Sequence, residues 1–140
     1  MSVNLTPEKM SQLQAEGWRN LRACELETGI KGIVIQFRCE GFFENKNEMQ
    51  ERHELEKAIG LALKQAEIGF CGAGQSGVGS IELLCYVRDL TKGSTILKEV
   101  LTQRGLLEGA VIAYADCADC VWRVVHPANY PKPFSLLGYQ

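Results

Sequence analysis

A glycine-rich segment in the middle of the chain constrains the fold more than any other feature. It runs over residues 69–80 as GFCGAGQSGVGS, with Gly72, Gly74 and Gly77 at G-x-G-x-x-G spacing. In a dinucleotide-binding loop of this spacing, the glycines lead from a strand into a helix whose N-terminus faces the phosphates. Here residues 81–88 alternate as a strand does, and no Lys-Ser or Lys-Thr pair follows the last glycine. We therefore predict a β-β connection, in which glycines allow positive φ angles and a bulged turn.

Hydrophobic periodicity predicts the elements around this connection. From residue 33 onward their order is strand, helix, strand, strand, helix, strand, which is the order of a ferredoxin-like split β-α-β domain. We therefore predict an α+β fold of ferredoxin-like type, an antiparallel sheet with helices on one face, extended by an N-terminal helix and a C-terminal strand. The strands are expected at 33–39, 67–71, 81–88, 110–115 and 121–125, and the helices from Asn45 or Asn47 to about 66 and from Thr91 or Ser94 to Gly105.

The helix that starts at Asn45 or Asn47 has the strongest pattern. Asn47 and Gln50 have the spacing of a capping box. Apolar residues recur at helical spacing and predict one buried face. Glutamates interleave with lysines and arginines over the rest of the helix, a pattern typical of a solvated, ion-paired face. The apolar positions are Leu55, Ala58, Ile59, Ala62, Leu63 and Ala66.

The length of 140 residues fits one domain. We divide residues 1–140 into an N-terminal helical extension (1–28), an α+β core (30–126) and an extended tail (127–140). The tail holds three of the four prolines, which favour extended backbone. Its aromatic residues Tyr130, Phe134 and Tyr139 are expected to pack back onto the domain.

Charge and hydropathy argue against several partners and locations. The chain carries 15 basic and 17 acidic side chains, for a net charge of -2, and shows no basic run. Direct nucleic-acid binding is therefore not expected, because such proteins usually show a basic excess or stripe. No apolar stretch is long enough to span a membrane, and the N-terminus lacks the apolar core of a signal peptide. We expect a cytoplasmic protein whose six cysteines are reduced.

The residues that most often carry chemistry give little sign of a catalytic centre. Cys117 and Cys120 form a C-x-x-C, but it lies between two predicted strands and lacks the second ligand pair of a zinc site. His53 and His126 are the only histidines, and their positions predict no catalytic pair. We expect no metal and no cofactor. Whether the protein is an enzyme stays open, with the pattern leaning against it.

The chain resembles the small bacterial immunity proteins that neutralise a cognate toxin, often a nuclease, in size, sign of charge and the split β-α-β layout with its glycine-containing connection. The resemblance implies a non-catalytic protein-binding module of the inhibitor type, active against a partner such as a basic toxin. Acidic side chains would then meet the basic surface, where complementary charge speeds encounter. The candidate binding residues are Glu48, Glu51, Glu54, Glu56, Gly74 and Gly77.

Two alternatives remain open. The first is a small-ligand-binding or thiol-dependent enzyme domain that uses the glycine-rich 72–79 segment, Cys71, and the pair Cys117 and Cys120. A ferredoxin-like sheet hosts many chemistries, so the fold does not decide between these functions. The second is a regulatory module that self-associates through a sheet edge, so that the protein is a monomer or a homodimer.

Overall fold

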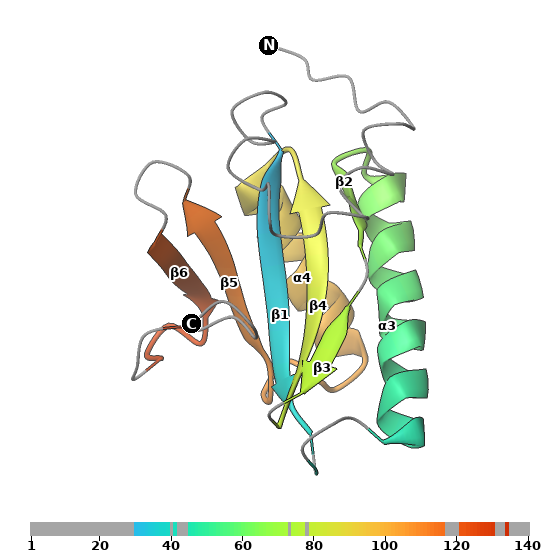
Figure 1. Ribbon diagram of the computed structural model, residues 1–140. Coiled ribbons are helices and arrows are strands. Elements are labelled where there is room, and N and C mark those ends of the chain that lie inside the picture. The colour runs from blue at the N-terminus through green and yellow to red at the C-terminus, as the bar shows by residue number, and fades with distance from the viewer. Residues whose placement is uncertain are drawn as a thin grey trace.

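The computed structural model describes residues 30–39, 41, 45–72, 74–77, 79–116, 121–130 and 134. In this part of the chain a six-stranded antiparallel sheet is joined to two helices (Figure 1). The predicted α+β class is confirmed, whereas the predicted N-terminal helix lies outside the described residues. The strands are β1 (Lys31–Arg38), β2 (Gly69–Cys71), β3 (Gln75–Gly77), β4 (Ser80–Val87), β5 (Val111–Asp116) and β6 (Val121–His126), and the helices are α3 (Lys46–Gln65) and α4 (Leu90–Gln103).

The sheet has the strand order β2-β4-β1-β5-β6, with β3 also paired to β4. β1 lies in the middle, and it pairs with β4 along its whole length, from Lys31 opposite Val87 to Arg38 opposite Ser80. Its other edge pairs with β5, and β5 pairs in turn with β6. β2 and β3 therefore follow one another along the remaining edge of β4, opposite the edge that β1 occupies.

The glycine-rich segment leads from strand to strand and not into a helix, as predicted, but part of it forms a strand of its own, β3, that the sequence analysis did not predict. Cys71 pairs with Cys85 and Gln75 pairs with Glu82, so the two pairings are four positions apart on one side and only three apart on β4. This extra residue is the mark of a β-bulge. Gly79 lies in the turn directly before β4, and its φ of 78° is in the left-handed region that favours glycine.

The start of α3 is confirmed at Asn45, one of its two predicted caps, whereas α4 begins earlier than the sequence predicts. α3 is capped by Asn45, whose side chain accepts a hydrogen bond from the Glu48 N–H at 2.8 Å, so the capping box predicted for Asn47 and Gln50 is wrong. α4 is capped by Asp89 rather than by Thr91 or Ser94, which lie inside the helix. β4 ends at Val87, so the chain turns into the helix at once. Asp89 is then the first capping side chain that it reaches.

The two helices end in the same hydrogen-bond arrangement. After α3, the Glu67 N–H donates to Lys64 O and the Ile68 N–H donates to Leu63 O. After α4, Gly105 and Leu106 bond in the same way to residues 102 and 101. This is the Schellman motif, in which the residue after the cap takes a left-handed conformation. The predicted stop at Gly105 is confirmed at φ 70°, whereas Glu67 holds a φ of 58° without the freedom of a glycine.

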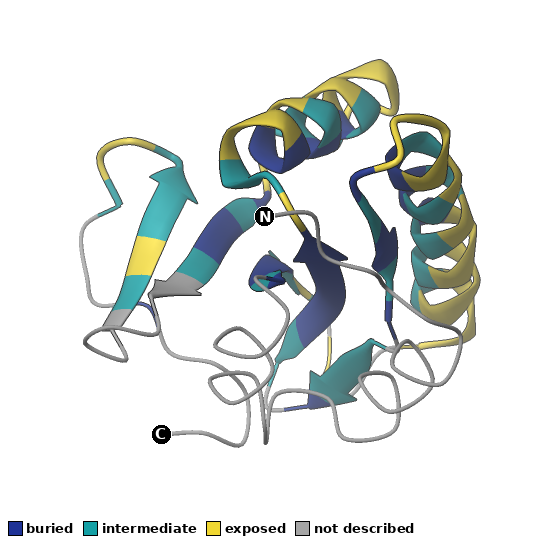
Figure 2. Ribbon diagram, turned by 90° about the horizontal axis from the view of Figure 1, so that it is seen from above, coloured by how far each residue is buried: buried dark blue, intermediate teal, exposed yellow. Residues whose placement is uncertain are grey.

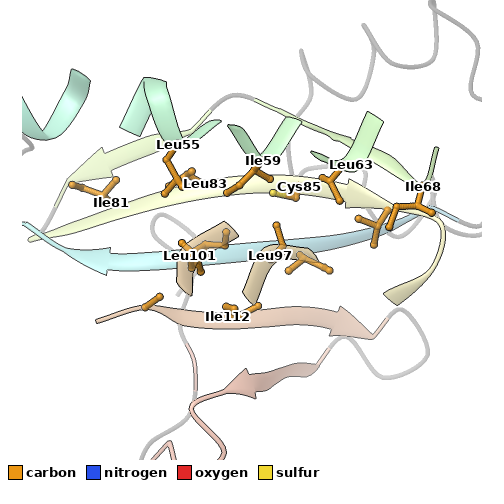
Figure 3. Packing of buried hydrophobic residues seen from close by; sticks show 14 residues of the cluster. Leu55, Ile59, Leu63, Ile68, Ile81, Leu83, Cys85, Leu97, Leu101 and Ile112 are labelled. Carbon is orange, nitrogen blue, oxygen red and sulfur yellow. The ribbon is translucent and has the colours of Figure 1, made fainter. Parts of the chain in front are cut away.

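The side of the sheet that faces the helices carries the larger hydrophobic cluster. α3 and α4 both lie on this side (Figure 2). Leu55, Ile59 and Leu63 project from one face of α3 onto alternate residues of the sheet (Figure 3). The apolar face predicted for this helix is therefore confirmed at its three buried positions, whereas the prediction is wrong for Ala66, which is exposed at the C-cap. The buried members are Ile33, Ile35, Leu55, Ile59, Leu63, Ile68, Ile81, Leu83, Cys85, Val87, Leu97, Leu101, Ala110 and Ile112.

The opposite face of the sheet carries a second buried cluster. Phe70 and Tyr86 stack there with ring centroids 5.1 Å apart, and Phe134 packs on Trp122 at 5.3 Å. The prediction that tail aromatics pack back is confirmed for Phe134 and for Tyr130, which contacts the same cluster. Tyr139 lies outside the described residues. The buried members are Ile30, Val34, Phe70, Leu84, Tyr86, Ala113 and Phe134.

Candidate functional site

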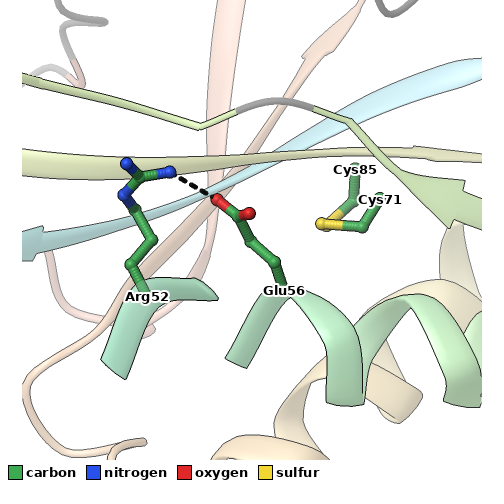
Figure 4. Close-up of polar contacts among 4 residues, drawn as sticks. All are labelled: Arg52, Glu56, Cys71 and Cys85. Carbon is green, nitrogen blue, oxygen red and sulfur yellow. Dashed lines mark hydrogen bonds and ion pairs between the residues drawn. The ribbon is translucent and has the colours of Figure 1, made fainter. Parts of the chain in front are cut away.

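α3 carries an ion pair onto the bulged edge of the sheet. The Arg52 Nη1 donates to the Glu56 Oε1 at 2.6 Å, one helical turn apart, as Figure 4 shows. The side chains are only 12% and 19% exposed, respectively. A pair with this little solvent contact is less screened than an exposed one, and it fixes both side chains against the strand.

Gly74 makes this approach possible. A Cβ at residue 74 would lie 2.6 Å from the Glu56 Oε1, 2.7 Å from the Arg52 Nη1 and 2.8 Å from the backbone oxygen of Glu82. Contacts under 3.0 Å are essentially never seen for a real Cβ. The glycine therefore serves the close packing of α3 against the bulge, a role that a phosphate-binding motif would not require.

Two cysteines lie farther along the same edge of the sheet, where β2 pairs with β4. Cys71 of β2 faces Cys85 of β4 with the sulfurs 4.0 Å apart, and the Cys85 thiol donates to Cys71 (Figure 4). This hydrogen bond, together with burial and the nearby charges of Cys71 and Glu56, raises the pKa of Cys85 well above its ordinary value of 9.0. The buried thiol of Cys85 therefore stays protonated at neutral pH.

Arg52 also borders a cavity of about 170 Å³ on the helical side of the sheet, which we call the α3 cavity. Its walls are apolar, and they come from the ends of β1 and β4, from α3 and from the segment after α4. Its rim is charged with both signs. The lining residues are Phe37, Arg38, Glu48, Glu51, Arg52, Leu55, Ile81, Leu83 and Leu106.

The four predicted glutamates have different surroundings. Glu48 is half-buried, and its carboxylate accepts the Asn45 N–H at 2.9 Å within the capping box, while it also lines the α3 cavity. Glu51 is exposed and lines the α3 cavity, and Glu54 is exposed but does not line it. Glu56 is held by Arg52. Only Glu51 and Glu54 therefore present their carboxylates largely to solvent.

The two predicted glycines also separate. Gly74 contacts the Arg52–Glu56 pair, whereas Gly77 lies buried at the end of β3, where it pairs with Ser80. Its φ of 151° is positive, which suits a glycine next to the turn. The structure thus brings Gly74 and Glu56 together and gives Gly77 a role in the hairpin. Their roles in binding stay predictions.

A buried polar cluster escaped the sequence reasoning. Glu82 of β4 is fully buried, and its two carboxylate oxygens accept hydrogen bonds from Gln36 at 2.8 Å and Gln75 at 2.7 Å. The sequence analysis did not single out Glu82. The apolar neighbours Leu84 and Tyr86 on the same face of the strand were the available signal, because a strand that is apolar on both faces is covered on both.

The other candidates for chemistry contribute little to this site. His53 is exposed on α3, and the His126 Nε2 lies 3.0 Å from the backbone oxygen of Leu107. Cys117 and Cys120 lie outside the described residues. Within the described ranges, no three His, Cys, Asp or Glu side chains gather as metal ligands would.

A second groove, of about 760 Å³, lies near the end of β1. It is more polar than the α3 cavity and includes two residues of the glycine-rich segment, Gly79 and Ser80, together with Cys39. Its described lining residues are Gln36, Phe37, Arg38, Cys39, Gly41, Gly79, Ser80, Gly109, Val111 and Tyr130.

Comparisons with known proteins identify no relative of this chain. Neither the family models, nor the curated proteins, nor the solved structures contain a match to this chain. Of the helices that the structure describes, none has the length and apolar character needed to cross a membrane.

Proposed function

We propose that the chain is a non-catalytic protein-binding module of the inhibitor or immunity type, which holds a partner protein at the α3 cavity. The observation that carries the proposal is an apolar cavity lined by the solvent-facing Glu51, with the exposed Glu54 three residues further along α3. Protein interfaces gain most of their binding energy where one anchor side chain fills such a pocket and polar groups surround it.

The size of the cavity favours a side chain over a cofactor. Pockets for cofactors and drug-sized ligands occupy roughly 300–1,000 Å³, whereas a cavity of about 150 Å³ holds a single benzene ring. At about 170 Å³, the α3 cavity accepts one aromatic or branched apolar side chain. The partner that we propose presents such a side chain on its surface.

The charges around the cavity indicate what should flank that anchor. Glu51 and Glu54 are exposed and lie three residues apart, so both reach the same side of α3. A partner with lysine or arginine next to its apolar anchor would be complementary to them. A basic bacterial toxin such as a nuclease fits this description, and we propose the cytoplasm as the place where the two proteins meet.

The fold that presents this surface is, we propose, a variant of the ferredoxin-like split β-α-β arrangement. The order β2-β4-β1-β5 supports it if β2 and β3 are counted as one bulged strand. In that description β6 is the additional C-terminal strand, and the α3 cavity lies beside the first helix of the split motif.

The test is a charge reversal on the proposed surface. The partner is captured from the native cells with the tagged full chain and is then purified for titration calorimetry. Glu51→Lys with Glu54→Lys should weaken binding at least about tenfold and reduce its dependence on salt, since rim charges set steering and part of the affinity. The same double variant should unfold in urea within about 0.5 kcal/mol of the wild type, because both side chains are exposed.

A matched control makes the same change of charge elsewhere. Glu67 and Glu99 are exposed and do not line the α3 cavity. Glu67→Lys with Glu99→Lys should therefore retain wild-type affinity within a factor of about three, as expected for remote surface charges. Equal losses in the two double variants would mean that only net charge matters, and the α3 cavity would then not be the binding surface.

The second groove supports one alternative function, binding of a small polar ligand by a ligand-binding or thiol-dependent enzyme domain. Its volume of about 760 Å³ lies in the range of ligand pockets, and it joins Gly79 of the glycine-rich segment to a thiol, Cys39. A thermal-shift screen of small metabolites would favour this alternative if a hit stabilised the wild type but not the Cys39→Trp variant, in which the groove is filled.

A further inference from the structure

Cys71 and Cys85 occupy a register position that suits a cross-strand bond. The Gly72 N–H donates to Leu84 O at 2.7 Å, which makes residues 72 and 84 a hydrogen-bonded pair. The preceding pair, Cys71 opposite Cys85, is then a non-hydrogen-bonded pair. The Cα atoms of such pairs lie about 4.5 Å apart, which falls inside the range of about 4.4–6.8 Å found in disulfides.

The surroundings leave room for the bond to close. The two sulfurs are already in contact at 4.0 Å, and a disulfide needs them at about 2.05 Å. α3 passes over the pair at Gly60, where an added Cβ would lie only 3.6 Å from the Cβ of Cys71. The helix therefore approaches closely without a side chain that would hold the sulfurs apart. Cys71 is half-buried and Cys85 is buried, so Cys71 is the more exposed of the two residues.

We propose that Cys71 and Cys85 are a thiol-disulfide switch that a low-molecular-weight disulfide, such as oxidised glutathione, closes. In the first step the Cys71 thiolate attacks one glutathione sulfur, a mixed disulfide forms and one glutathione thiolate leaves. In the second step the Cys85 thiolate attacks the Cys71 sulfur, and the second glutathione leaves. The protein loses two electrons and two protons, and one oxidised glutathione becomes two reduced ones.

The structure also fixes the order of the two cysteines. Cys85 is fully buried and donates its proton toward Cys71, so it is neither accessible nor ionised at the start. Cys71 is the more exposed residue of the pair and the acceptor of that hydrogen bond. Cys71 therefore reacts first and Cys85 resolves the mixed disulfide. This inference is independent of the binding surface at the α3 cavity.

The experiment equilibrates the full chain in buffers of oxidised and reduced glutathione, blocks free thiols by alkylation and maps the products by peptide mass spectrometry. We expect a Cys71–Cys85 link, a mass loss of about two hydrogens and the protection of two thiols. Closing residues 71–85 makes a loop of about 15 residues, for which the melting temperature of a 140-residue chain should rise by about 5–10 °C. Dithiothreitol should reverse the shift.

Two variants distinguish the switch from general oxidation. Cys71→Ala should abolish the link and the temperature shift, whereas Cys39→Ala, which removes another half-buried cysteine, should leave both unchanged. Cys85→Val keeps a buried apolar side chain and should leave Cys71 trapped as the glutathione adduct. The proposal is overturned if the wild type itself retains that adduct with Cys85 free, or if the shift persists in Cys71→Ala.

Discussion

The substitution Gly74→Ala tests how α3 packs against the bulged edge. The added methyl group would lie 2.8 Å from the backbone oxygen of Glu82, which belongs to the fully paired strand β4. It would also lie 2.6 and 2.7 Å from the tips of Glu56 and Arg52. The ends of the Glu56 and Arg52 side chains can rotate away, although this breaks their ion pair. The backbone oxygen of Glu82 cannot move without disturbing the pairing of β4 with β1.

The expected loss of stability follows from these contacts. Inserting one methylene into a well-packed site costs roughly 1–3 kcal/mol. We expect the upper half of this range, because one of the three close atoms is backbone. With a urea dependence of about 1.5 kcal/mol per molar, the unfolding midpoint should fall by about 1–2 M.

The assay is urea unfolding followed by tryptophan fluorescence and by circular dichroism, with Gly109→Ala as the matched control. A Cβ at residue 109 would meet no atom within 4 Å. The control should therefore be neutral or gain up to about 1 kcal/mol from the lower entropy of its unfolded state. In an Arg52→Ala, Glu56→Ala background, adding Gly74→Ala should cost about 1 kcal/mol less than in the wild type, because the two tips are gone.

Equal midpoints for Gly74→Ala and Gly109→Ala would refute the reasoning. They would mean that the bulge accommodates a methyl group and that the Arg52–Glu56 pair does not press against it. An undiminished cost in the double-alanine background would instead assign the whole effect to the backbone oxygen of Glu82.

Two further predictions concern a helix end and a buried thiol. Glu67→Gly should raise the free energy of unfolding by about 0.5–1 kcal/mol and Gly105→Ala should lower it by about 1 kcal/mol, because both residues hold left-handed φ angles, and calorimetry would check both signs. The native state keeps the Cys85 proton at pH values at which the unfolded chain loses it, so its contribution is complete below pH 9.0 and declines as the pH rises above that value. Urea unfolding between pH 8 and 10.5 should show this decline in the wild type and a smaller one in Cys85→Val.

The sequence predicts the longer described elements well because each has its own periodic signal, whereas the three-residue strand β3 has none and was not predicted. Alternation located the central strands, and the 3.6-residue repeat located the buried face of α3 at Leu55, Ile59 and Leu63. The helix starts were harder, because several polar residues in a row can all act as caps. Asn45 and Asp89 were selected over their neighbours by where the chain enters and leaves the sheet, which is a tertiary property.

The candidate site was predictable only in part for the same kind of reason. Glu56 and Gly74 were both singled out from the sequence, but their contact depends on the register between α3 and the bulge. The α3 cavity joins residues as distant as Phe37 and Leu106, and no local pattern connects them. The hydrogen bonds that bury Glu82 likewise come from two other strands, through Gln36 and Gln75.

The burial of β4 on both faces has a consequence for how freely the sequence can vary. Residues 81–87 are all buried, since the helical side covers one set and the second cluster covers the other. A strand with one solvent-exposed face tolerates substitutions at every second position. In β4, by contrast, each of seven consecutive residues is buried against packed neighbours. On α3, by contrast, only three of 20 residues are buried. Variation should therefore accumulate on the helix that carries the proposed binding surface, while the strand beneath it stays nearly fixed.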